Sequence, residues 1–310
     1  MKVDYALILA AGKGTRMGEI GKQLPKVLWP VYEKSILELE VLYALELGIK
    51  KIFINTFNYK EKIKEYFQQS EILQKATLIE ENEKLDIGGA VHNLAQEVSY
   101  KGNLIIFNSD QFIFLTKENW DAAFERFNNS DHLIFSYDVN SNDLYNALDS
   151  QGHKLTGIIS NEKIERNSDI MTYTGMSLIK LDKLNPSPGE SKFFNTVANY
   201  SDSNVSIFNI KDSEYWDFGT LKRYKSSMQN ILEKANKSNQ FVDFLIRNDA
   251  FIKAKTNLEL RSYNSDTKNC LNLTNEKLDI KNSIILKRPN NTDFEEEDYK
   301  IIYEDLVFTF

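Results

Sequence analysis

The feature that most restricts the fold of this chain is an apolar run that leads directly into a glycine-rich turn. Residues 5–11 are apolar throughout, and residues 7–17 read LILAAGKGTRM. A continuous apolar run is typical of a strand that is buried on both faces. Gly12 and Gly14 allow backbone N–H groups to approach an anion closely. The pattern therefore predicts a buried strand followed by a phosphate-binding loop.

Two common phosphate-binding patterns do not fit this loop. A P-loop requires a glycine, four further residues and then Gly-Lys-Ser/Thr, and neither Lys13 nor Lys22 has that spacing. The dinucleotide fingerprint requires G-x-G-x-x-G, but Gly12 and Gly14 are followed by Gly18, one residue too far along. No acidic residue follows the second expected strand to hold a ribose. If the loop binds phosphate, it therefore belongs to a third kind of phosphate-binding site.

Short apolar runs alternate with longer amphipathic ones over the first 110 residues. This alternation is typical of βαβ units and predicts a mostly parallel sheet. Further strands, some antiparallel, are expected after about residue 130, and helical spacing returns over residues 221–255. The expected strands are 5–10, 51–56, 76–80, 103–107, 132–137, 154–159, 173–180, 205–210, 278–286 and 300–303, and the expected helices before residue 130 are 36–45, 59–68, 89–98 and 116–127.

Composition excludes several classes of function. The 310 residues include 38 basic and 45 acidic side chains, a net charge of −7, which gives no electrostatic basis for wrapping nucleic acid or docking on an anionic membrane. The single cysteine, Cys270, excludes an intrachain disulfide. No apolar run reaches the roughly 20 residues that a membrane span requires. We expect a cytoplasmic protein with no nucleic-acid or membrane partner.

Two segments resemble the signature of a known enzyme family. Residues 9–17 (LAAGKGTRM) and 25–28 (PKVL) are similar to the L-A-A-G-x-G-T-R-M and P-K-x-L motifs of the sugar-1-phosphate nucleotidyltransferases. The resemblance covers roughly residues 1–230. It implies an α/β fold with a Rossmann-like, mostly parallel mixed sheet of the GT-A-like kind. Residues 231–310 are then a small C-terminal appendage, helical and then β-rich.

The family reaction joins an NTP and a sugar 1-phosphate into an NDP-sugar and releases pyrophosphate. The resemblance implies that Leu9, Ala10, Gly12 and Gly14 bind the nucleotide. Two cations are expected at the phosphates, with Arg16 on the β- and γ-phosphates and Lys26 near the α-phosphate. Such transfer depends mainly on charge neutralisation and in-line positioning. No general base is required, because a phosphate monoester with a second pKa of about 6 is already largely dianionic at neutral pH.

Two aspartates are candidates for holding Mg²⁺. Asp110 closes the apolar segment 104–110 at the carboxyl end of an expected strand, where ligands bind in open α/β sheets. The sequence N-S-D at residues 108–110 is similar to the N/G-x-D motif that follows an apolar strand in this family. Asp217 lies in W-D-F-G-T, which resembles the motif of the family's second metal-binding aspartate. The alternative is that Asp217 only joins a turn, with Thr220 capping the next helix.

The sugar and base sites rest on weaker similarities. Glu162 and Lys163 resemble an E-K-P element that contacts the sugar and its phosphate, with Ile164 in place of the proline. Gly175 resembles a glycine that backs the sugar ring, although a simple strand glycine explains it nearly as well.

The segment LDIGGA, residues 85–90, resembles a loop that meets base, ribose or sugar, with Gly88 as the candidate contact. With the acidic residue Asp86, this segment resembles most the corresponding loop of the muramate-1-phosphate uridylyltransferases and of the mannose- or heptose-1-phosphate guanylyltransferases. Glu81 is the candidate base reader, because a carboxylate accepts hydrogen bonds from a ring N–H and an exocyclic amine together. This favours guanine.

Two alternatives to the sugar-phosphate reaction stay open. Relatives that act as cytidylyltransferases use phosphocholine or another alcohol phosphate. A nucleotide-binding regulator without turnover is the other alternative, although the presence of both Asp110 and Asp217 argues against it. The appendage has short β-like pieces such as residues 282–286, which resemble one partial β-helix coil, and it is a candidate homodimer interface.

Overall fold

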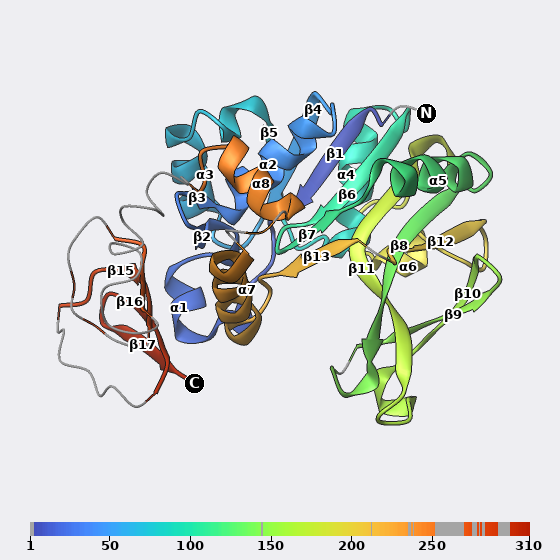
Figure 1. Ribbon diagram of the computed structural model, residues 1–310. Coiled ribbons are helices and arrows are strands. Elements are labelled where there is room, and N and C mark those ends of the chain that lie inside the picture. Colours follow the sequence, from blue (N-terminus) through green and yellow to red (C-terminus); the bar gives the residue numbers. More distant parts are fainter. Residues whose placement is uncertain are drawn as a thin grey trace. The chain divides into compact units, whose positions relative to one another are not determined.

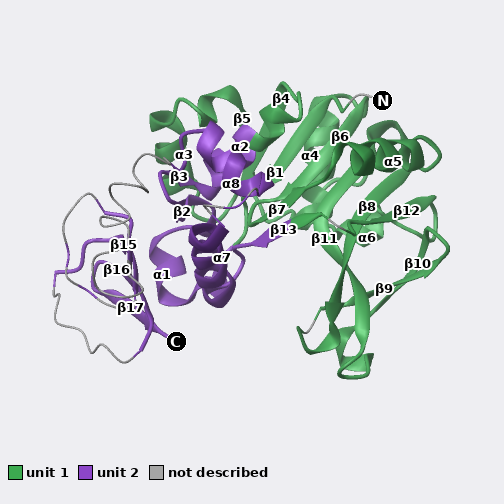
Figure 2. Cartoon of the chain, in the orientation of Figure 1, with its two compact units in different colours: residues 1–12, 43–214 green, residues 13–42, 215–310 purple. Residues whose placement is uncertain are grey.

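The computed structural model describes residues 3–143, 145–211, 213–234, 237, 239–251, 270–274, 278, 280, 283–290 and 298–310. The chain forms two compact units, coloured separately in Figure 2. Unit 1 contains residues 1–12 and 43–214, and unit 2 contains residues 13–42 and 215–310. The chain therefore passes from unit 1 to unit 2 directly after Gly12, within the glycine-rich loop.

A nine-stranded mixed sheet forms the centre of unit 1 (Figure 1). Its first four strands are parallel, β11 is antiparallel to both of its neighbours, and β8 and β12 are parallel to each other. This confirms the expected mostly parallel mixed sheet. The strands in sheet order are β5 (Thr77–Glu80), β4 (Lys51–Thr56), β1 (Tyr5–Leu9), β6 (Asn103–Asn108), β11 (Asp169–Lys180), β8 (His132–Asn140), β12 (Val205–Asn209), β10 (Lys154–Ile159) and β9 (Ala147–Gln151).

Successive side chains of a strand point to opposite faces of the sheet, and this alternation determines which residues form the core of unit 1. Leu7 of β1 and Ile106 of β6 share one buried cluster with α4 (Asp86–Glu97) and α6 (Phe193–Thr196). Ala6 and Ile8 are also completely buried, so β1 is covered on both faces, as its continuous apolar sequence predicts.

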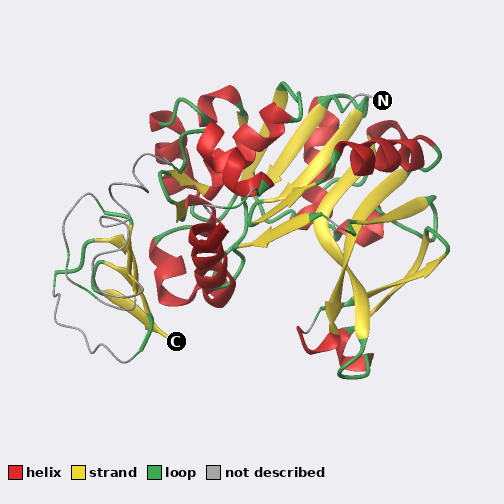
Figure 3. Cartoon of the chain, in the orientation of Figure 1, coloured by secondary structure: helices red, strands yellow, loops and turns green. Residues whose placement is uncertain are grey.

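Two of the further helices, which are red in Figure 3, begin at residues with recognisable capping signals. Thr116 accepts a hydrogen bond from the N–H of Asn119 and begins α5 (Lys117–Asn128), as expected. A capping box begins α2 (Ile36–Glu46), in which the hydroxyl of Ser35 and the carboxylate of Glu38 bond each other's backbone N–H. The remaining helix of unit 1 is α3 (Lys60–Gln69).

Unit 2 begins with short helical turns that continue from the glycine-rich loop. They are η1 (Thr15–Met17), α1 (Gly18–Gln23) and η2 (Lys26–Leu28), and they are followed by β2 (Pro30–Val31) and β3 (Lys34–Ser35). In the same unit the ring of Trp29 meets the edge of Tyr224, with centroids 4.9 Å apart. Tyr224 belongs to α7 (Leu221–Lys234), which precedes α8 (Gln240–Arg247). The expected boundary at residue 231 falls inside α7, and the division into residues 1–230 and 231–310 stays a prediction.

The carboxyl-terminal strands form a separate sheet. In it, β14 (Cys270–Asn272), β15 (Ser283–Lys287) and β16 (Lys300–Tyr303) are parallel, and β17 (Leu306–Thr309) pairs with β16 in the antiparallel sense. The partial β-helix coil and the homodimer interface expected here stay predictions. Of the expected 221–255 helical segment, residues 235, 236, 238 and 252–255 lie outside the described residues, as do residues 279, 281 and 282 of the expected 278–286 strand.

Several short strands have no clear signal in the sequence. They are β7 (Gln111–Phe114), β9, β13 (Glu214–Asp217) and β17, each of four or five residues. Runs of this length show too few alternations to define a period. Among the described residues, no helix combines the length and apolar character of a membrane-spanning segment.

The amino end of α4 packs tightly against the segment 189–192. Gly88 is buried, and the N–H of Gly89 donates a 3.2 Å hydrogen bond to Ser191 O. A Cβ added at Gly88 would lie 2.6 Å from Ser191 O and 2.8 Å from Lys192 O. These are backbone atoms, so a side chain at position 88 would displace the segment.

We expect Gly88→Ala to lower the free energy of unfolding by roughly 1–3 kcal/mol through overpacking. The higher helix propensity of alanine, worth about 1 kcal/mol, is too small to offset an overlap with two carbonyl groups. The measurement is urea unfolding followed by circular dichroism. Gly157→Ala is the matched control, because its Cβ would meet Asp149 at an ordinary 3.4 Å, and it should change stability by less than about 0.5 kcal/mol. Equal stabilities of the two variants would contradict the packing argument.

Candidate active site

Three polar side chains hold the loop that follows β1. The N–H of Ala10 donates to Asn55 Oδ1 at 2.9 Å, and Asn58 Nδ2 donates to Ala11 O at 2.6 Å. The hydroxyl of Ser109 donates to Leu9 O. Three consecutive residues of the loop, 9–11, are thus held through their backbone atoms. The sheet register explains this, because Leu9 pairs with Asn55 of β4 and with Asn108 of β6, directly before Ser109.

Glu81 is joined to this loop through the same asparagine. It follows β5 directly, its N–H donates to Thr56 O at 2.9 Å, and its side chain accepts a 2.6 Å hydrogen bond from Asn55 Nδ2. Glu81 is only 4% exposed. Burial raises the pKa of Glu81 above its ordinary value, and the hydrogen bond from Asn55 offsets part of that rise. The candidate base reader is a desolvated carboxylate that is held by a neutral amide.

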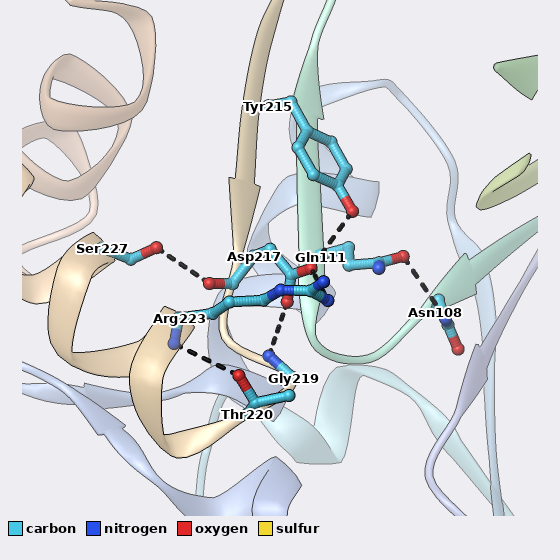
Figure 4. A network of polar contacts seen from close by, with 8 residues as sticks. All are labelled: Asn108, Gln111, Tyr215, Asp217, Gly219, Thr220, Arg223 and Ser227. Atoms are coloured by element: carbon cyan, nitrogen blue, oxygen red, sulfur yellow. Dashed lines mark hydrogen bonds and ion pairs between the residues drawn. The ribbon is translucent and has the colours of Figure 1, made fainter. Parts of the chain in front are cut away.

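The N-S-D segment lies directly after β6. Asp110 is 1% exposed, and its N–H donates to Asn108 O at 2.7 Å. The side chain of Asn108 donates to Gln111 at 3.3 Å (Figure 4). A Cβ at Gly175 of β11, where φ is +90°, would lie 2.6 Å from Asn108 Cβ. Gly175 is therefore required by its backbone and by close packing against this segment, whatever role it has toward a sugar.

Within unit 2, the glycines of the loop have local structural reasons. Gly14 has φ of +61° and precedes η1, and its Cβ would lie 3.7 Å from Lys26 Cβ. Of the three phosphate candidates in this unit, Gly14, Arg16 and Lys26, the structure therefore places Gly14 and Lys26 next to each other. Arg16 belongs to η1 and is exposed. Gly12, in unit 1, differs from Gly14, because a Cβ there would meet no atom within 4 Å.

Asp217 is the centre of a polar network in unit 2 (Figure 4). Its carboxylate accepts from the N–H of Gly219 at 2.7 Å and forms a 2.9 Å ion pair with Arg223. The hydroxyl of Ser227 donates to the backbone O of Asp217 at 2.8 Å. Thr220 Oγ1 accepts from the N–H of Arg223, as the cap expected before α7. Asp217 therefore does join a turn, as the alternative interpretation holds, and it also carries a charge partner that the sequence analysis missed.

The remaining candidates lie elsewhere in unit 1. Glu162 and Lys163 are exposed on the short turn η5 (Asn161–Lys163). The role of these two residues toward a sugar stays a prediction. Among the described residues, no three His, Cys, Asp or Glu side chains gather into a metal-binding group.

Comparison with known proteins identifies the family. Residues 5–152 match the family model described as "Nucleotidyl transferase". The chain is 28% identical over 188 residues to a D-glycero-alpha-D-manno-heptose 1-phosphate guanylyltransferase of Campylobacter jejuni, which covers 61% of this chain and 81% of that protein. Over residues 5–152, the chain is thus similar to the nucleotidyl transferase family. This nucleotidyltransferase is also 24% identical over 269 residues to a bifunctional sugar-1-phosphate nucleotidylyltransferase/acetyltransferase of Sulfurisphaera tokodaii, covering 83% of this chain and 64% of that one.

Solved structures agree on the fold of the nucleotidyltransferase. HddC from Yersinia pseudotuberculosis superposes with a TM-score of 0.63 at 20% identity, covering 74% of this chain and 99% of that chain. UDP-glucose pyrophosphorylase from Acinetobacter baumanii gives 0.62 at 19% identity, covering 84% and 100%. At these identities the likeness concerns the fold. The suspected family and the enzyme class are confirmed.

The buried carboxylate of Glu81 generates a prediction for stability. Because its pKa in the folded protein lies above the ordinary value of 4.5, the wild type loses stability as the pH rises through that pKa. Glu81→Gln removes the buried charge, while its amide oxygen can still accept from Asn55. We expect the variant to be more stable at pH 7 by about 0.5–2 kcal/mol, an advantage that vanishes below pH 4.5.

Thermal unfolding between pH 4 and pH 8, a range that begins below the ordinary carboxyl pKa, checks this expectation. Glu65→Gln, which changes an exposed carboxylate of α3, is the control and should show no such pH dependence. A Glu81→Gln protein that is less stable than the wild type at pH 7 would show that the charge contributes favourable interactions in the folded state.

Proposed function

We propose that this nucleotidyltransferase transfers a nucleotidyl group from an NTP to a sugar 1-phosphate and releases pyrophosphate. The observation that carries the proposal is the loop after β1, whose backbone is held at Leu9, Ala10 and Ala11 by side chains of neighbouring segments. A backbone fixed in this way can present N–H groups to phosphates without reorganisation. The curated relatives named for sugar 1-phosphates support the acceptor class.

The phosphate subsite is proposed at Gly12 and Gly14 with the cations Arg16 and Lys26. Packing does not explain Gly12, since a side chain there would meet no atom within 4 Å, but close approach of a ligand does. Arg16 presents a planar fork for the β- and γ-phosphates, and Lys26 presents a compact charge for the α-phosphate. Leu9 and Ala10 contribute backbone atoms to the same nucleotide.

The residues present suit a magnesium ion. Asp110 is 1% and Asp217 is 9% exposed, and both offer the carboxylate oxygens that Mg²⁺ prefers in proteins. When bound, the ion neutralises phosphate charge at the transferred group. Asp110 and Asp217 are the proposed ligands. Arg223 would balance the charge of Asp217 in the absence of the ion, because the two side chains are paired at 2.9 Å.

Attack on the α-phosphorus requires no protein base. The sugar phosphate is largely dianionic at neutral pH, since its second pKa is about 6. Glu162, Lys163 and Gly175 are the proposed sugar-side residues, and Gly88 is proposed to contact the base, the ribose or the sugar. The proposed location is the cytoplasm.

Guanine is the proposed base. Its Watson–Crick edge presents a ring N–H and an exocyclic amine, both of which donate to a carboxylate such as that of Glu81. Adenine and cytosine present a ring nitrogen acceptor at that edge, which a carboxylate repels. The Campylobacter jejuni relative is named as a guanylyltransferase, and HddC has been crystallised with GMP-PN.

The experiment that tests the proposal is a matrix of four NTPs against several sugar 1-phosphates, with phosphocholine as a further acceptor. Pyrophosphate release is the readout. We expect release with GTP and a sugar 1-phosphate in the presence of Mg²⁺, and none after chelation. Pyrophosphate release only with CTP and phosphocholine would show that the acceptor is an alcohol phosphate and not a sugar 1-phosphate. Tight NTP binding without pyrophosphate release under any condition would indicate a regulator.

Asp110→Asn should lower the rate of pyrophosphate release by at least about a hundredfold, because the nearly isosteric change removes the negative charge that holds the cation. Circular dichroism should show an unchanged fold. Asp121→Asn, which changes an exposed carboxylate of α5, is the control and should keep the wild-type rate. A near-normal rate in Asp110→Asn would remove this residue from the mechanism.

A further inference from the structure

Asn55 occupies a junction between the candidate base site and the candidate phosphate loop. It lies near the carboxyl end of β4, between β1 and β5 in the sheet, and it is 3% exposed. Its Oδ1 accepts from the N–H of Ala10 at 2.9 Å, and its Nδ2 donates to Glu81 Oε1 at 2.6 Å. The three groups come from three neighbouring segments of unit 1.

The orientation of this amide is determined by its partners. A backbone N–H can only donate, so the oxygen of Asn55 must face Ala10 and its NH₂ group must face Glu81. Glu81 must therefore accept at Oε1, and the hydrogen bond is strongest when the carboxylate is ionised. Asn55 favours the charged, acceptor form of Glu81 against the effect of its burial.

The other oxygen of Glu81 remains for a ligand. Among the described residues, no group donates a hydrogen bond to Glu81 Oε2, although the residue as a whole is only 4% exposed. Glu81 Oε2 is not among the fully buried atoms that lack a partner, so it remains open to a donor from outside the protein, such as an N–H group of a bound base. The carboxylate is thus fixed at one oxygen by Asn55 and open at the other.

We propose that Asn55 is a positioning residue that sets nucleobase specificity. It orients the carboxylate of Glu81 toward donor edges such as that of guanine and links it to the backbone of the phosphate loop at Ala10. The base and the phosphates of a nucleotide would then bind to one hydrogen-bonded group, formed by Glu81, Asn55 and the backbone at Ala10. This inference rests on the proposed role of Glu81 as the base reader.

Asn58 provides the matched control. It also bonds the loop backbone, at Ala11 O, but among the hydrogen bonds of the described residues none joins Asn58 to Glu81. A purely structural role of Asn55 would make the two asparagines equivalent. Loss of Asn58 should loosen the loop for every nucleotide, and loss of the Asn55 bond to Glu81 should change the preference among bases.

The experiment is calorimetric titration of GTP and ATP into the full chain without a sugar phosphate, so that no turnover occurs. The readout is the ratio of the ATP and GTP dissociation constants. Asn55→Asp keeps an acceptor for Ala10 but places a carboxyl group against Glu81, and two such groups share a proton. We expect it to reduce the ratio by at least about tenfold, the effect of one charged hydrogen bond. Asn58→Ala should weaken both nucleotides and keep the ratio within about twofold.

Further variants distinguish a wrong role for Asn55 from a wrong assignment of Glu81 as the base reader. Asn55→Ser removes the donor to Glu81 without adding a charge, and it should also reduce the ratio if Asn55→Asp does not fold. Glu81→Gln tests the base reader itself. If Glu81→Gln lowers the ratio but both Asn55 variants keep it, or if Asn58→Ala lowers it equally, the role of Asn55 is wrong. If Glu81→Gln leaves the ratio unchanged, the base reader is wrong and the inference fails with it, whereas pyrophosphate release in the matrix still reports on the transfer reaction.

Discussion

Hydrogen bonds from side chains to the backbone after β1 are the interaction on which the rest of the site depends. The strand ends at Leu9, and the chain then leaves the sheet without entering a helix, so its buried N–H and C=O groups need other partners. Asn55, Asn58 and Ser109 supply them. Each unsatisfied group would cost about 1–3 kcal/mol. The same bonds that stabilise the fold therefore keep the loop in one conformation.

The parallel register of the sheet makes this arrangement possible. In parallel strands the carboxyl ends lie at one edge, and Leu9 pairs with both Asn55 and Asn108. Glu81 follows β5 and Asp110 lies just after β6, at the same edge, with β4 and β1 between these two strands. The edge thus gathers two buried carboxylates near a loop of fixed geometry. Burial of such charges lowers stability, a cost that is commonly accepted at functional sites.

The glycines of this chain have different physical reasons. Gly88 is needed because backbone carbonyls of residues 191 and 192 lie where its side chain would be, and Gly175 because of its positive φ and its contact with Asn108. Gly14 combines a positive φ with a position beside Lys26. Only Gly12, among the four candidate site glycines, lacks such a reason. A glycine-rich motif is therefore partly a folding requirement and partly an opening for a ligand.

The sequence by itself determined the sheet, most helices and the family. The strands over residues 51–56, 154–159 and 300–303 have the expected bounds, because burial on one or two faces imposes a period that is visible within each segment. Thr116 likewise shows its cap locally. The motifs around residues 9–17 and 25–28 were sufficient to recognise a nucleotidyltransferase, since they are contiguous.

Only the tertiary structure decided which polar groups meet. Asn55 bonds Ala10, 45 residues away, and Glu81, 26 residues away, and neither partner follows from any local pattern. The sequence predicts a strand over residues 51–56, but it gives no sign that Asn55 within it has a role at the site. The pairing of Asp217 with Arg223 spans just six residues, yet it depends on how α7 begins after Thr220. Local periodicity determines which face of an element is buried, and the pairing of strands distant in the chain determines which side chains share a hydrogen bond.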